Sequence, residues 1–213
     1  PFLAPNKYFD LYPYDKITYQ TDRPNMWDFL PQSALSKRYQ AFGFEFGKEN
    51  HALRKEYIQA YHACVSFIDA QLGLVLDGLK KNGLWEDTII IFTSDHGEQI
   101  GDHWLLGKLG YFDESYHIPL IIRDPSNHQN KGKIIEEYTE NVDVMPTMLD
   151  WFDLPIPVQC DGQSLLPFLK NDKTPSNWRD AAHWEYDFRD IVEGSAMEKS
   201  LGLTHHQCTL NVL

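Results

Sequence analysis

The run Thr88-Ile-Ile-Ile-Phe-Thr-Ser-Asp-His-Gly-Glu-Gln-Ile-Gly-Asp-His-Trp-Leu-Leu-Gly-Lys108 begins as a strand and ends among polar and charged side chains. Its first six residues are all β-branched or aromatic, a composition typical of strands. An apolar run without polar alternation is typical of a strand covered by helices on both faces, so we expect a central, parallel strand over 88–93. A carboxylate and an imidazole, Asp95 and His96, follow where that strand ends.

The segments around this strand predict further regular structure. Apolar residues recur every three or four positions over 52–82, which predicts a long helix capped by Asn50 and ended by Gly83. After the strand, we expect a second short strand over 118–123 and a polar loop over 124–134.

The later segments continue this alternation. Residues 142–152 predict a short helix, with Asp143 as its cap and Pro146 in its first turn. A turn and a brief helix are expected over 161–169, and a strand over 181–186. Helices that alternate with strands predict an α/β fold, in which ligands gather at the carboxyl ends of strands. Asp95 and His96 stand at such an end.

Three parts of the chain differ in composition. Residues 1–50 are rich in proline and aromatic residues, so we expect an irregular segment that packs on the core. Residues 51–170 carry the predicted α/β core with Asp95 and His96, and 171–213 a late strand region cut short at its C-terminus. Both ends of the 213-residue chain look cut rather than natural, so we leave its compartment open and favour the cytoplasm over the periplasm.

The net charge of −12 argues against a nucleic-acid partner, because phosphate backbones require clustered Lys and Arg. It is compatible with a small anionic substrate, since a metal ion and a few cationic side chains reverse the potential locally.

The longest apolar runs are too short to span a bilayer. The widely spaced Cys64, Cys160 and Cys208 indicate reduced thiols rather than a disulfide framework. Whether the protein forms a homo-oligomer stays open.

Asp95 and His96 are the candidate metal ligands. On a regular strand adjacent side chains point to opposite faces, but Gly97 just beyond the strand lets both converge on one ion. A carboxylate suits Mg²⁺, Ca²⁺ or Mn²⁺, and an imidazole also suits Mn²⁺ and Zn²⁺. Two ligands do not complete a site, so at least two more must come from elsewhere. Alternatively, Asp95 caps the next turn and His96 hydrogen-bonds a backbone carbonyl.

Lys108 and His117 are the candidate catalytic residues. Lys108 lies between two glycines and can contact an ester oxyanion as a point charge, although an exposed surface lysine is the simpler alternative. His117 can act as a further oxyanion contact or general acid, or else serve as a partly buried structural histidine. For the nearby Glu98, Asp102 and His103, we expect a solvated loop face.

The motif Ser94-Asp-His-Gly97, continued by Gly101-Asp-His103 and by Gly107-Lys108, resembles the sulfatase family of the alkaline phosphatase superfamily. Phosphoglycerate mutases and phosphopentomutases share a similar Asp-His-Gly motif, but the continuation to Gly-Lys is similar to sulfatases and phosphonate monoester hydrolases. Four further blocks resemble the same family, the last of them its phosphonate monoester hydrolase subgroup: 60–73, 114–122, 141–147 with 161–169, and 183–189.

The resemblance implies an alkaline phosphatase-like mixed sheet flanked by helices. It also implies a hydrolase of sulfate, phosphonate or phosphate esters that uses a formylglycine nucleophile beside one divalent cation, Ca²⁺ or Mn²⁺ before Zn²⁺ or Mg²⁺. Asp95 and His96 match two of the metal ligands, and Lys108 the lysine that contacts substrate oxygens. His117 matches only by position.

The chain departs from the family pattern at the nucleophile. Formylglycine forms from the cysteine of Cys-x-Pro-x-Arg, and none of Cys64, Cys160 and Cys208 stands in that motif. We therefore expect the middle-to-late part of a larger enzyme and no turnover from these residues alone. A sulfatase-like fold used only for binding is the main alternative. A phosphomutase is a further one, although it would need a second set of metal ligands.

Overall fold

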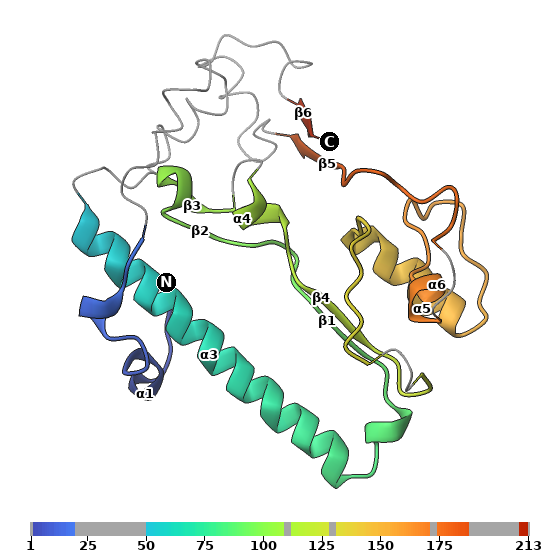
Figure 1. The fold of residues 1–213 in the computed structure, drawn as a ribbon, viewed down its shortest axis with the longest axis horizontal. Helices are drawn as coiled ribbons and strands as arrows, with labels where there is room; N and C mark the ends of the chain where they lie inside the picture. The colour runs from blue at the N-terminus through green and yellow to red at the C-terminus, as the bar shows by residue number, and fades with distance from the viewer. Residues whose placement is uncertain are drawn as a thin grey trace, which may run out of the picture. The chain divides into compact units, whose positions relative to one another are not determined.

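The computed structural model describes residues 2–19, 50–108, 112–127, 131–170, 174–187 and 209–212 (Figure 1). The chain forms two compact units. Unit 1 comprises Pro1–Gly83, His96–Pro119 and Asp187–Thr209, and unit 2 comprises Leu84–Asp95, Leu120–Tyr186 and Leu210–Leu213. The boundaries expected at residues 50 and 170 stay predictions.

The long predicted helix is the main element of unit 1. Helix α3 spans His51–Lys81, with Asn50 at its N-cap position but without a side-chain hydrogen bond from that residue. It ends where the N–H of Gly83 donates to the carbonyl of Lys80, and Gly83 takes a φ of 70°. A positive φ is costly for other residues, so the predicted glycine stop is confirmed.

The N-terminal residues of unit 1 lie along α3 (Figure 1). They form helix α1 (Asn6–Phe9) and the 3-10 turn η1 (Tyr14–Lys16), so this part contains short helical turns instead of irregular chain alone. Tyr8 is buried against Phe67 of α3, with ring centroids 5.3 Å apart. Aromatic burial is thus what attaches the described part of the predicted segment to α3. Residues 20–49 lie outside the described residues.

The length and composition of α3 also match those of a membrane-spanning helix, which the short apolar runs of the sequence did not suggest. Core helices share these two properties, and α3 packs on α1 through Phe67 and Tyr8. Val65, Ile68 and Val75 on the surface of α3 are exposed, so the expected absence of a membrane span stays a prediction.

A small hairpin completes unit 1. Strand β2 (Gln99–Ile100) pairs antiparallel with β3 (Leu106–Gly107), and the 3-10 turn η4 (Asp102–Trp104) connects them. Helix α4 (Asp113–Tyr116) follows. Leu105 in the hairpin is fully buried.

Unit 2 contains the predicted strand, with one important difference. Strand β1 (Ile90–Thr93) follows the 3-10 turn η3 (Trp85–Asp87) and pairs with β4 (Leu120–Arg123). The pairing is antiparallel, so the expectation of a parallel strand is wrong. Burial on both faces is not observed either, since β1 is half-buried and its last residue, Thr93, is exposed.

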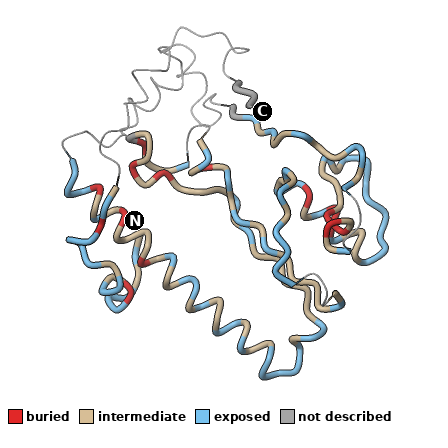
Figure 2. Tube along the Cα trace, viewed as in Figure 1, coloured by how far each residue is buried: buried red, intermediate tan, exposed pale blue. Residues whose placement is uncertain are grey.

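The core of unit 2 lies around α5 (Val144–Trp151) and α6 (Leu166–Leu169), where buried segments gather in Figure 2. Leu165, Leu166 and Phe168 are buried there. The 3-10 turn η5 (Asn141–Asp143) leads into α5, which confirms the predicted helix. The last described pair of strands is β5 (Trp184–Asp187) with β6 (Thr209–Val212).

Asp143 does not cap α5 with its side chain. Its carboxylate instead accepts the backbone N–H of Glu140 at 2.8 Å and that of Gln163 at 2.8 Å. Asp143 is completely buried, so its oxygens must find partners within the protein. Asp143 therefore connects the chain at Glu140 with the chain at Gln163 instead of capping α5.

Candidate active site

Asp95 lies two residues beyond the end of β1 and is exposed. The residue before it is held by a side chain from η5. The amide of Asn141 donates to the carbonyl oxygen of Ser94 at 2.8 Å, and its Oδ1 accepts the hydroxyl of Thr93 at 3.1 Å. The side chain of Asn141, which lies outside β1, thus holds the backbone that directly precedes Asp95.

His96 is half-buried, and its Nδ1 lies 2.7 Å from the carbonyl oxygen of Gly97. This contact is of the kind expected for a structural histidine. It also suits a metal ligand, because a ligating histidine usually donates one ring N–H to a carbonyl and binds the ion with the other nitrogen. When Nδ1 of a neutral imidazole donates its N–H, Nε2 is the ring nitrogen that can act as a metal ligand.

Gly97 has a reason to be glycine other than the turn expected from the sequence. Its N–H donates to the carbonyl of Ser115 at 2.7 Å, which brings it against the backbone of α4. A Cβ at this position would lie 2.1 Å from the carbonyl oxygen of Glu114. The segment after His96 can approach α4 this closely only because residue 97 lacks a side chain.

Lys108 follows strand β3 directly and is exposed, which is compatible with both readings of it. Its neighbour Gly107 takes a φ of 76°, and the Gly107 N–H donates to Oε1 of Glu98 at 3.0 Å. The same carboxylate oxygen accepts the hydroxyl of Tyr57 at 2.9 Å. Burial of Tyr57, this hydrogen bond and the Glu98 charge all raise the pKa of the Tyr57 phenol.

The expected solvated face at Glu98, Asp102 and His103 is not observed, because all three are half-buried. Asp102 lies 3.8 Å from the guanidinium of Arg54, which is itself buried. Arg54 packs so closely on Gly101 that a Cβ there would lie 2.3 Å from its Nε. These acids are therefore structural partners inside unit 1.

His103 stacks on Phe112 with ring centroids 3.8 Å apart and lies 3.4 Å from the carboxylate of Glu114. His117 differs from it, since it ends α4 and is exposed. The exposure of His117 does not favour the alternative of a partly buried structural histidine. Its catalytic role stays a prediction.

The predicted metal ligands are Asp95 and His96, and the described residues around them do not form a complete metal site. They hold no group of three or more His, Cys, Asp and Glu side chains placed to bind an ion. The boundary between the units falls between Asp95, in unit 2, and His96, in unit 1. The Asp95 carboxylate and the His96 Nε2 fit two of the ligands of a divalent cation, and further ligands are needed to complete the shell.

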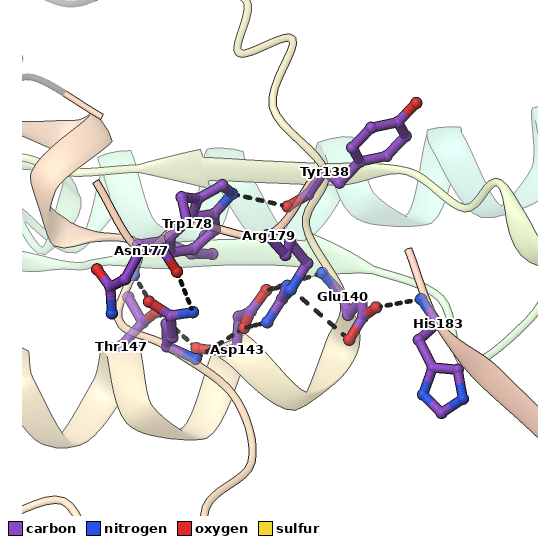
Figure 3. Close-up of polar contacts among 10 residues, drawn as sticks. Tyr138, Glu140, Asp143, Thr147, Asn177, Trp178, Arg179 and His183 are labelled. Atoms are coloured by element: carbon purple, nitrogen blue, oxygen red, sulfur yellow. Dashed lines mark hydrogen bonds and ion pairs between the residues drawn. The ribbon is translucent and has the colours of Figure 1, made fainter. Parts of the chain in front are cut away.

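Sequence reasoning missed a polar cluster in unit 2 (Figure 3). Arg179 donates to both carboxylate oxygens of the buried Asp143, with Nη2 to Oδ1 at 2.7 Å. It also lies 3.9 Å from Glu140, whose carboxylate accepts the backbone N–H of His183 at 2.5 Å. The hydrogen bonds to Asp143 raise the pKa of Arg179, against the opposing effect of burial.

The cluster extends into the start of α5. Thr147 donates its hydroxyl to the carbonyl of Asp143 at 2.6 Å and accepts the N–H of Leu165 at 2.8 Å. Both Asp143 and Thr147 are fully buried. The sequence signal that could have revealed this cluster is the spacing of Asp143 and Thr147, an acid and a hydroxyl four residues apart at the otherwise apolar start of α5.

A sulfatase family model matches residues 4–154, more than half of the chain. The chain belongs to the sulfatase family. A second model, described as N-sulphoglucosamine sulphohydrolase, C-terminal, matches residues 101–208. The family resemblance inferred from the Asp95-His96-Gly97 motif is therefore confirmed.

Curated relatives agree with this assignment. The chain is 48% identical over 153 residues to the multifunctional alkaline phosphatase superfamily protein PehA of Trinickia caryophylli, covering 72% of this chain and 29% of that protein. It is 33% identical over 190 residues to an arylsulfatase of Clostridium perfringens, covering 88% of this chain and 38% of that protein. The chain thus spans about a third of the length of these relatives.

The solved phosphonate monoester hydrolase of Agrobacterium radiobacter matches 100% of this chain with a TM-score of 0.84 and 36% identity. The chain covers 44% of that structure. The alkaline phosphatase-like α/β fold class is therefore confirmed, and the described strands β1 and β4 form an antiparallel pair within it.

Proposed function

We propose that the protein carrying this chain is a metal-dependent hydrolase of sulfate esters or of phosphonate and phosphate esters. The observation that carries the proposal is a sulfatase-family chain with a carboxylate, Asp95, just past the end of β1, followed at once by a histidine. The Nδ1 of His96 is engaged by a carbonyl, which suits a ligand that binds through Nε2.

Asp95 and His96 would hold one divalent cation, with Ca²⁺ or Mn²⁺ favoured and Zn²⁺ or Mg²⁺ open. Bound there, the cation would polarise the ester and offset the negative charge that builds up on its oxygens. Such local compensation would favour binding of an anionic substrate to a chain whose net charge is −12.

Lys108 would contact the oxygens of the sulfuryl or phosphoryl group. It is exposed at the end of the β2–β3 hairpin, and its backbone is tied through Gly107 to Glu98. A fixed ammonium group stabilises developing oxyanion charge without having to reorganise during the reaction. His117, exposed at the end of α4, is the proposed source of a proton for the leaving group.

The nucleophile in this proposal is formylglycine, supplied from a Cys-x-Pro-x-Arg motif that residues 1–213 do not contain. That absence is also what favours a second candidate, a sulfatase-like protein that binds without catalysis. A Cys-x-Pro-x-Arg or Ser-x-Pro-x-Arg motif in the full-length protein would decide for the enzyme.

The direct test measures hydrolysis of paired aryl sulfates and phosphonate monoesters by the full-length protein, before and after chelation and metal return. We expect activity that chelation removes and that Asp95→Ala lowers by several orders of magnitude, whereas Asp77→Ala, an exposed helix carboxylate, leaves it unchanged. Full activity of Asp95→Ala, or full activity after exhaustive chelation, would refute the metal-dependent mechanism.

A further inference from the structure

The contacts of Asn141 suggest a role in presenting Asp95. Its side chain makes two hydrogen bonds to the end of β1, one to the carbonyl of Ser94 at 2.8 Å and one with the hydroxyl of Thr93 at 3.1 Å. The first of these bonds joins residues that are 47 positions apart. Both of its contacts are to the two residues that directly precede Asp95.

The bond to Ser94 acts on Asp95 through the peptide group. The Ser94 carbonyl and the Asp95 N–H belong to one planar unit, because the peptide bond has partial double-bond character. Holding the Ser94 oxygen therefore fixes the orientation of the whole plane up to the Cα of Asp95. Only the dihedral angles of Asp95 itself remain to place its carboxylate.

The other end of this link is anchored in the core of unit 2. Asn141 begins the turn η5, whose last residue is Asp143. The Asp143 carboxylate is completely buried and accepts hydrogen bonds from Glu140, Gln163 and Arg179. These hydrogen bonds to a charged group hold the turn η5 in place. Because the turn is already ordered, little further conformational entropy is lost when the side chain of its first residue, Asn141, hydrogen-bonds the end of β1.

We propose that Asn141 is a positioning residue for the metal ligand Asp95, with the Asp143–Arg179 pair as its anchor. This inference rests on the proposed function, since it takes Asp95 as a ligand. Asn141 does not touch the ion in this proposal. It limits the positions that the Asp95 carboxylate samples, so that the ion does not have to order the end of β1 when it binds.

The test compares Mn²⁺ binding to the metal-free full-length protein, measured by calorimetry or by the paramagnetic signal of free Mn²⁺. Asn141→Ala should weaken Mn²⁺ binding by about 10-fold or more, the range typical for residues that orient a ligand. The matched control is Asn127→Ala, which removes an asparagine bond of the same kind, to the carbonyl of Leu169, elsewhere in unit 2.

A second variant guards against a folding defect. Thr93→Val keeps a β-branched side chain for the strand but removes the hydroxyl that Asn141 accepts, so a smaller loss of Mn²⁺ affinity is expected. The thermal midpoints of the metal-free variants should match that of Asn127→Ala.

These results test two claims, the positioning role of Asn141 and the metal site at Asp95. Wild-type Mn²⁺ affinity in both Asn141→Ala and Thr93→Val overturns the positioning role, as does a loss equal to that of Asn127→Ala. Wild-type Mn²⁺ affinity in Asp95→Ala would instead overturn the proposed metal site, which keeps the two failures distinguishable.

Discussion

Arg179 and Asp143 form a two-point ion pair in which both carboxylate oxygens accept a guanidinium N–H. Asp143 is completely buried, and the guanidinium lies against the ring of Trp178 at 5.2 Å from its centroid. The pair joins residues 36 positions apart and fixes the turn from which Asn141 reaches the end of β1. Both hydrogen bonds of this pair are charge-assisted, the kind that is roughly twice as strong as a neutral hydrogen bond.

Removing the cation of this pair should be costly. In Arg179→Ala the buried Asp143 carboxylate loses its counter-charge, so the free energy of unfolding should fall by about 3–5 kcal/mol. Urea unfolding of the full-length protein measures this loss. Lys80→Ala, which breaks an exposed pair with Asp77, should change it by less than about 0.5 kcal/mol. Equal effects of the two substitutions would contradict the role of Arg179 as the counter-charge of the buried Asp143.

Glu98 should support the proposed role of Lys108. Glu98→Ala removes the acceptor of the Gly107 N–H and frees the hairpin end that carries the lysine. We expect kcat/KM on a sulfate ester to fall about 10-fold, which corresponds to about 1.4 kcal/mol of transition-state stabilisation. The affinity for Mn²⁺ should not change.

Two comparisons check that prediction. Glu98→Gln keeps an oxygen acceptor for Gly107 and should recover most of the activity. Asp77→Ala removes an exposed carboxylate from α3 and should have no effect. Loss of Mn²⁺ binding in Glu98→Ala, in parallel with activity, would point to general damage rather than to Lys108.

Gly97 and Gly73 should respond to alanine in opposite ways. At Gly97 the new Cβ would lie 2.1 Å from the backbone oxygen of Glu114, so the loop or α4 must move, at a cost of about 1–3 kcal/mol. At Gly73 nothing lies within 4 Å and the residue is inside α3, so alanine should stabilise by about 0.5–1 kcal/mol. Thermal unfolding of both variants checks the difference, and a stable Gly97→Ala would disprove the close approach.

The hydrogen bond between Tyr57 and Glu98 should make stability depend on alkaline pH. Burial and the nearby carboxylate raise the pKa of Tyr57 above its ordinary value. The folded state thus holds the phenol proton more tightly than the unfolded state. The associated stability is complete below about pH 10, the ordinary pKa of tyrosine, and is lost as the pH rises towards the folded-state pKa.

Urea unfolding at pH 7 to 11.5 tests this effect through Tyr57→Phe. At neutral pH the variant should be less stable than wild type by about 1 kcal/mol, because Glu98 loses a hydrogen bond. The difference should shrink above pH 10. A difference that stays constant over the whole range would show that the phenol is not held in its neutral form.

Some of this arrangement could be predicted from local sequence alone. The three- and four-residue spacing in 52–82 predicted α3 to within one residue at each end. The run 88–93 predicted β1, although the strand begins at Ile90. Periodicity and composition encode such elements because each residue's preference depends mainly on its near neighbours. The family, too, could be recognised from the residues around Asp95.

The pairing partner of β1 could not be predicted in this way. Its antiparallel alignment with β4 depends on the path of the chain between them, and an apolar run does not specify direction. Glu98 and Asp102 are further examples, since loop acids look solvated until Tyr57 and Arg54 of α3 are placed beside them.

The sequence by itself determined the long helix, the strand with Asp95 and His96 at its end, and membership of the sulfatase family. Only the tertiary structure decided that Asn141 holds the end of that strand and that Arg179 neutralises Asp143. The physical reason is the distance along the sequence over which each kind of interaction acts. Local preferences act over a few residues, whereas these hydrogen bonds join residues 47 and 36 positions apart and exist only once the chain has folded.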